Sequence, residues 1–141
     1  MAYSTRENLQ LAIDDVQLIQ LTDDKDINTI DWDIVDQFRV NADALIDGYI
    51  GGRGWTLPLS PVPTIIAKFS DDILIYDLYG RRGGAPEYVK ERYMNAIKFL
   101  QGIAEGKNSL GIDDPAESET TGDMEFSYNT RTFTRTTMEG F

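Results

Sequence analysis

The chain has 141 residues, of which 41% are hydrophobic and 11% aromatic, and its net charge is −11. This length and apolar content predict one folded domain with one core and argue against wholesale disorder. The chain contains neither cysteine nor histidine, which excludes disulfides, structural zinc sites and histidine-activated nucleophiles. No apolar run approaches the roughly 20 residues that a membrane span requires.

The charge is spread unevenly along the chain. Residues 1–51 carry 11 acidic and 3 basic side chains (net −8), residues 52–111 carry 6 and 8 (net +2), and residues 112–141 carry 7 and 2 (net −5). A chain this acidic is not expected to bind a nucleic-acid backbone tightly through general attraction. Its acidic first part suits the mildly basic middle part of a neighbouring copy; the simpler interpretation is an acidic surface that only keeps the protein soluble.

Two short helices are predicted before residue 23. Ser4 and Glu7 fit a capping box, in which the serine oxygen accepts a hydrogen bond from an early helix amide and the glutamate reaches back. The helix that follows is expected to bury Leu9, Ala12 and Ile13. Asp14 and Asp15 are expected to cap a second helix over residues 16–21.

The segment 22–31 is rich in aspartate. Asp24, Asp26 and Asn28 occupy the first, third and fifth positions that a calcium-binding loop uses. Its sixth and twelfth positions require a glycine and a bidentate glutamate, and this sequence has neither there. We therefore interpret the segment as a solvated turn and expect no bound metal.

A long amphipathic helix is predicted from Asp31 or Asp33 to about residue 50. Its apolar residues recur with the 3.6-residue period of one helix face: Ile34, Val35, Phe38, Ala42, Leu45, Ile46 and Tyr49. The helix is expected to end at glycines, which accept backbone angles that side chains resist: Gly51, Gly52 and Gly54. A stiff connection follows at Pro58, Pro61 and Pro63, the last of which suits the first turn of the next helix.

Arg53 and Trp55 lie on this glycine-rich turn, where the hydrophobic core is not expected to need either side chain. Two interpretations remain open. Either the turn is an ordinary corner with Trp55 folded back onto the core, or both residues contact a partner.

Two further helices complete the predicted domain. The first, from 64 to about 79, is apolar over a wide arc and is expected at the centre of the bundle. Arg81 and Arg82 are expected in its last turn, where they either interact with the helix dipole or contact an acidic partner surface. The last helix, from Pro86 to near Gly106, carries a regular apolar stripe: Val89, Tyr93, Ala96, Ile97, Leu100, Ile103 and Ala104.

Paired carboxylates occur at Asp71 and Asp72 and at Asp43 and Asp47. On helices such pairs are most simply exposed charges, and no companion motif indicates a sugar or phosphate site. The glycine groups follow predicted helices, whereas a phosphate-binding loop needs glycines that run from a strand into a helix. We therefore expect no enzymatic activity and no cofactor.

The character of the sequence changes after the helical domain, residues 1–111. Residues 112–123 have no periodicity and are interpreted as a flexible linker. Residues 124–141 are rich in threonine and aromatic residues, which favour extended structure. We predict an extended C-terminal arm that docks on another subunit or a neighbouring protein; the alternative is a tail that is disordered or folds back on its own bundle. The arm's expected contact residues are Phe126, Tyr128, Phe133, Arg135 and Phe141.

Short motifs along the chain resemble one protein family. Ile46-Asp-Gly-Tyr49, Gly52-Arg53 and Leu57-Pro-Leu59 are similar to the Mu-like phage family of small neck proteins, the head-to-tail connector or adaptor proteins. Further matches occur in order over nearly the whole chain: Leu18 to Asp23, Leu78-Tyr79, Arg81-Arg82, Arg92-Tyr93, Gly106-Lys107 with Leu110, Phe133 to Arg135, and Gly140-Phe141. The order and spacing of these motifs carry the resemblance. One departure is Gly54, which stands before Trp55 where the family's aromatic usually follows the arginine directly.

The resemblance implies a structural protein of the virion neck, made in the host cytoplasm. It implies an adaptor ring, a dodecamer, that binds the portal and the tail-completion or stopper protein, while genome DNA passes through without sequence-specific binding. No membrane is involved. Unlike surfaces that meet head to tail close into such a ring when the rotation suits, and we expect contacts at Arg53, Trp55, Arg81 and Arg82 and in the arm. The alternatives are a stopper or tail-completion protein of the same neck, or a helical protein-binding module unrelated to virions.

Overall fold

Five α-helices and one 3₁₀ helix make up the part of the chain that the structure, a computed structural model, describes: residues 2–112. Their bounds are α1 Arg6–Ala12, α2 Asp15–Thr22, α3 Trp32–Ile50, η1 Gly51–Arg53, α4 Thr64–Gly80 and α5 Glu87–Ala104. No strand occurs among these residues. The predicted all-α bundle is confirmed, while the predicted arm falls on residues outside the described part.

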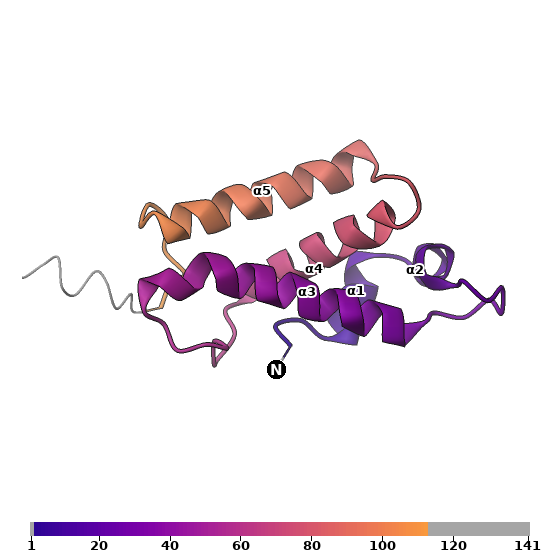
Figure 1. Cartoon of the computed structure of the whole chain (residues 1–141), viewed down its shortest axis with the longest axis horizontal. Helices are drawn as coiled ribbons and strands as arrows, with labels where there is room; N and C mark the ends of the chain where they lie inside the picture. Colours follow the sequence, from indigo (N-terminus) through magenta and orange to yellow (C-terminus); the bar gives the residue numbers. More distant parts are fainter. Residues whose placement is uncertain (1, 113–141) are drawn as a thin grey trace, which may run out of the picture.

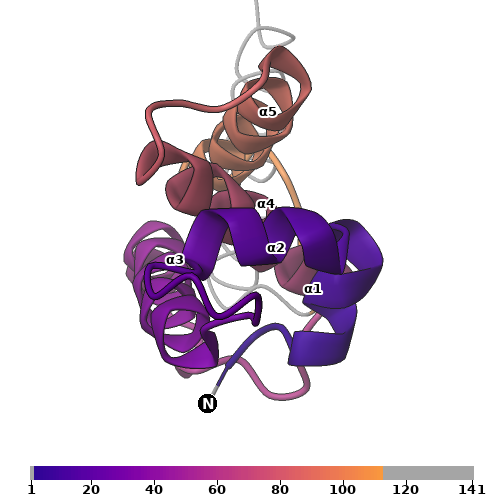
Figure 2. The same cartoon turned by 90° about the vertical axis from the view of Figure 1, so that its right-hand side faces the viewer.

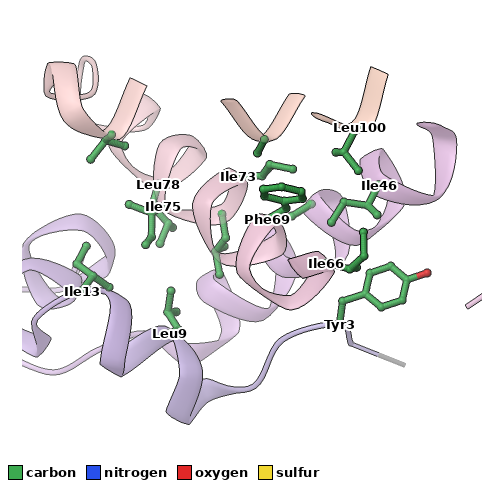
Figure 3. Close-up of a cluster of buried hydrophobic side chains, with 14 of the residues drawn as sticks. Tyr3, Leu9, Ile13, Ile46, Ile66, Phe69, Ile73, Ile75, Leu78 and Leu100 are labelled. Atoms are coloured by element: carbon green, nitrogen blue, oxygen red, sulfur yellow. The ribbon is translucent and has the colours of Figure 1, made fainter. Parts of the chain in front are cut away.

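Helix α4 is the central element, as its wide apolar arc predicts. Helices α3 and α5 pack along it, and α1 and α2 contact it from a further side (Figures 1 and 2). Its buried apolar residues meet those of the other helices in one core. Figure 3 shows Leu9 of α1, Ile13 just after α1, and Ile46 of α3 around it. Aromatic pairs join α4 to α5: Phe69 with Phe99 and Tyr76 with Tyr93, the latter stacked with ring centroids 4.0 Å apart.

Side-chain capping explains where two of the helices begin. Asp31 accepts hydrogen bonds from the amides of Asp33 (3.1 Å) and Ile34 (3.4 Å), which confirms Asp31 as one of the two predicted starting points of the long helix. The predicted cap of the first helix is wrong by one residue. Thr5, not Ser4, accepts from the Asn8 amide at 3.2 Å, because the Ser4 hydroxyl is used elsewhere.

The connection from α3 to α4 turns at Gly54, whose φ of 91° lies in the left-handed region that favours glycine. Leu59, which is buried in the core, follows between two cis peptide bonds, Leu57–Pro58 and Ser60–Pro61. Pro63 is the residue before the first turn of α4 rather than part of it. None of the helices within residues 2–112 is long and apolar enough to cross a membrane.

Two residues assigned to apolar stripes do not reach the core. Leu45 of α3 is 37% exposed, and Ala104, at the end of α5, is also exposed. The other members of both stripes are buried or half-buried. Each outlier lies at the edge of its stripe, where a small change in helix rotation moves a side chain from the core to solvent.

Candidate functional site

The two arginines after α4 bind an acidic loop of their own chain. Arg81 donates from Nη1 to the Leu21 carbonyl oxygen and from Nη2 to Asp24 Oδ2, both at 2.6 Å. Arg82 donates to the other oxygen, Asp24 Oδ1, also at 2.6 Å. The pair therefore clamps the segment after α2 onto the end of α4. Neither interpretation of the arginines, helix dipole or partner surface, anticipated this role.

The clamp leaves an open depression beside it. Ile19, Tyr79, Arg82 and Gly84 help to line a cavity of about 610 Å³ between the end of α2 and the loop that joins α4 to α5. Arg82 remains partly exposed at its edge. Its guanidinium is therefore reachable from outside even though it binds Asp24.

Arg53 and Trp55 lie at the opposite end of the bundle from the clamp. The α3–α4 connection and the end of α5 form one end, whereas the loop before α3 and the loop after α4 form the other (Figure 1). Trp55 is half-buried and packs against the core. The Arg53 guanidinium lies against Gly106, where a Cβ atom would be 3.0 Å from Nη1. Within the described residues the four predicted contact residues thus form two separate groups.

The remaining predicted contact residues are Phe126, Tyr128, Phe133, Arg135 and Phe141, and all of them lie outside the residues that the structure describes. Their place relative to the bundle is therefore still a prediction.

Three carboxylates that the sequence pattern assigned to the surface are buried: Asp43, Asp71 and Asp72. The expectation of exposed charges is wrong because each buried carboxylate faces hydrogen-bond donors or cations of the same chain. Asp43 of α3 accepts from Ser70 Oγ at 2.8 Å and from the Tyr3 amide at 3.1 Å. Burial raises the pKa of Asp43, and these hydrogen bonds oppose that rise.

Asp71 and Asp72 are adjacent on α4 but face different partners. Ser4 Oγ donates to Asp71 Oδ1 at 2.5 Å, and burial raises the pKa of Asp71 to about 6. Asp72 Oδ2 accepts from Lys68 Nζ at 2.6 Å. Its Oδ1 lies 2.7 Å from Arg92 Nη2, which is close enough for an ion pair although the two groups are not aligned for a hydrogen bond.

Tyr3 completes this buried polar network. Its hydroxyl donates to Asp47 Oδ1 and accepts from the Leu59 amide at 3.2 Å. Burial, together with the hydrogen bond to Asp47, raises the pKa of Tyr3 to about 12. The residues before α1 are therefore fastened to α3, to α4 and to the proline-rich connection at once.

The network is arranged to hold the fold together. Its carboxylates are engaged by donors of the chain itself, and no group of three or more metal-ligating side chains occurs within residues 2–112. One signal of burial was present in the sequence: Asp71 and Asp72 interrupt the most apolar helix of the chain. Nothing local indicated the donors, since Ser4 is 67 residues from Asp71.

Comparison with known proteins gives the chain a family. The sequence model described as "Bacteriophage Mu, Gp36" matches residues 3–127, which include every described helix. A relative from Haemophilus influenzae, the Mu-like prophage FluMu protein gp36, is 31% identical over 142 residues, covering 99% of this chain and 97% of the relative. The chain therefore belongs to the phage Mu Gp36 family, as the ordered motifs indicated.

Proposed function

We propose that this chain is a structural protein of the phage virion, an adaptor whose copies form a ring between the portal and the tail-completion proteins. The observation that carries the proposal is the family match to a phage protein over residues 3–127. The buried network supports a structural role, since Asp43, Asp71 and Asp72 hold helices together and are withdrawn from solvent. We assign the chain no enzymatic activity and no cofactor.

The surface of the bundle suits contacts between unlike faces. Among the acidic side chains of the first part of the chain, Asp14, Asp15 and Asp33 are exposed, while Lys90 and Lys98 are exposed on α5. Opposite charges on different faces favour a head-to-tail contact over a symmetric one. An acidic wall around a channel would also repel the DNA backbone and so let the genome slide through.

The arm is the proposed means of reaching the portal or a neighbouring copy. Its aromatic residues suit pockets on a partner, and Arg53 and Trp55, at the end of the bundle where α5 finishes, are proposed to extend the contact surface. Arg81 and Arg82 act indirectly in this account, since they position the acidic loop through Asp24.

Co-sedimentation with purified portal protein tests the proposal, using the full chain and a version that ends at Gly111. The full chain is expected to sediment with the portal and to be found by mass spectrometry in intact particles, whereas the shortened version is expected to bind more weakly. Binding to the tail-completion protein but not to the portal would support a stopper instead. Absence from particles would leave a protein-binding module outside the virion as the better assignment.

A further inference from the structure

A pocket lies on the outer side of α3, beside the N-terminal segment. It encloses about 270 Å³ and is lined by Ala2, Arg39, Val40, Asp43, Ala44 and Asp47. Val40 is 67% exposed and supplies an aliphatic side chain to the pocket lining. The pocket therefore joins an apolar wall to carboxylates.

The charges around this pocket favour a positively charged side chain of a partner. Arg39 pairs with Asp36 through Nη1, 2.7 Å from Oδ1, while its Nε and Nη2 have no hydrogen-bond partner among the described residues. In the lining, the carboxylates of Asp43 and Asp47 outnumber this one guanidinium. The Tyr3 hydroxyl donates to Oδ1 of Asp47. Within the described residues Oδ2 accepts no hydrogen bond, so it can accept one from another molecule. An apolar wall with a carboxylate at its rim fits a lysine side chain, whose stem is aliphatic and whose end is charged.

A matching surface is present on α5. Lys90, Met94 and Lys98 are spaced four residues apart, so they lie on one side of the helix. Met94 is 61% exposed, and both lysines are exposed. Within residues 2–112 neither lysine has an ion-pair partner, unlike Lys68 and Lys107. The helix thus presents an apolar side chain between two uncompensated positive charges.

We propose that the Lys90–Met94–Lys98 surface of one copy docks on the α3 pocket of the next copy. Met94 packs against Val40, and a flanking lysine places its ammonium at Asp47. Because α3 and α5 pack on α4 from different directions (Figure 2), each copy carries both surfaces and contacts two neighbours. Such a head-to-tail contact builds a ring or an open filament. This inference rests on the proposed ring and names the contact that forms it.

Cysteine cross-linking tests this contact, because the natural chain contains no cysteine. A V40C/M94C chain, oxidised in intact particles and as purified protein, is expected to give a ladder of covalent multimers. Each single variant should stay monomeric, and a mixture of the two should stop at dimers. The matched control is L11C/M94C, since Leu11 is 87% exposed on α1, outside the proposed contact; it should form no ladder. Multimers from V40C alone would indicate a symmetric contact and overturn the proposal.

Charge reversal supplies a second readout. In the V40C/M94C background, K90E/K98E is expected to reduce the ladder at least tenfold, whereas K107E, at an exposed lysine paired with Glu105, should leave it unchanged. Circular dichroism confirms that each variant folds. If the chain is present in particles but forms no ladder, the contact is wrong and the virion role stands. If the chain is absent from particles, the virion role is wrong. The contact is then judged on purified protein, where a ladder supports it and the absence of a ladder refutes it.

Discussion

Arg92 of α5 lies 2.7 Å from the carboxylate of Asp72 of α4, and that carboxylate is completely removed from solvent. Lys68, one turn before Asp72, approaches its other oxygen at 2.6 Å. A buried carboxylate that keeps its charge needs such partners, since burial of an uncompensated charge is costly. Arg92 therefore ties α5 to the central helix, and this contact helps to set the position of the Lys90–Met94–Lys98 surface, while Lys68 supplies a second cation from α4 itself.

Replacing Arg92 by alanine is expected to lower the free energy of unfolding by about 2 kcal/mol. Loss of one partner of a buried pair costs roughly 3–5 kcal/mol, and the figure is reduced here because Lys68 remains and Arg92 is itself partly exposed. Urea unfolding at low protein concentration measures the change. Lys98→Ala, which removes an exposed cation from the same helix, should cost less than about 0.5 kcal/mol. Equal costs for the two variants would contradict a structural role for the pair.

Asp71 is expected to make stability depend on pH. Burial raises the pKa of Asp71 to about 6 from its ordinary value of 3.8, so between these pH values the folded chain holds a proton that the unfolded chain releases. The stabilising contribution of this group is therefore complete at low pH and is lost as the pH rises through about 6. Asp71→Asn keeps an oxygen that accepts from Ser4 but removes the titration. The variant should gain stability relative to the natural chain from pH 4 to pH 7, and a difference that is constant with pH would count against this account.

Asp24→Ala is expected to free the loop without unfolding the bundle. It removes the acceptor that Arg81 and Arg82 share, and exposed ion pairs contribute roughly 0.2–1 kcal/mol each. Amide hydrogen exchange should accelerate over residues 23–30 and stay unchanged in α5. Asp26→Asn is the control, because Asp26 is exposed with a φ of 55° that asparagine tolerates. Unchanged exchange in the Asp24 variant would show that the clamp does not hold the loop.

Gly102 is expected to resist replacement by alanine. A Cβ atom there would lie 2.1 Å from Asn108 Nδ2, because the Asn108 side chain folds over Gly102 to donate to the Phe99 carbonyl oxygen at 3.2 Å. To make room, the Asn108 side chain must turn away and lose this hydrogen bond, at a cost of roughly 0.5–1.5 kcal/mol. This cost offsets the gain of up to about 1 kcal/mol from alanine in a helix.

A double-mutant cycle measured by thermal unfolding checks the cause of that cost. Asn108→Ala should recover most of the loss caused by Gly102→Ala, because it removes the group that the new methyl displaces. If the two changes are additive, the close approach is not what makes Gly102 necessary.

Much of the fold follows from local patterns in the sequence. Apolar periodicity gives α3, α4 and α5 almost to their ends, and glycine and proline mark the turns between them. The partners of polar groups do not follow from such patterns. Arg81 finds Asp24 at a distance of 57 residues, and Ser4 leaves its expected capping role to reach Asp71. Because carboxylates are usually exposed, the sequence predicts Asp71 and Asp72 on the surface. Donors that are distant in the sequence allow both to be buried.

The proposed ring on the portal is tested by electron cryo-microscopy of the full chain mixed with its portal protein. We expect a ring of additional density on the portal, on the side that receives the tail, into which copies of the five-helix bundle fit with α3 of one copy facing α5 of the next. A portal with no added density, while the chain stays in solution as a folded monomer, would contradict it.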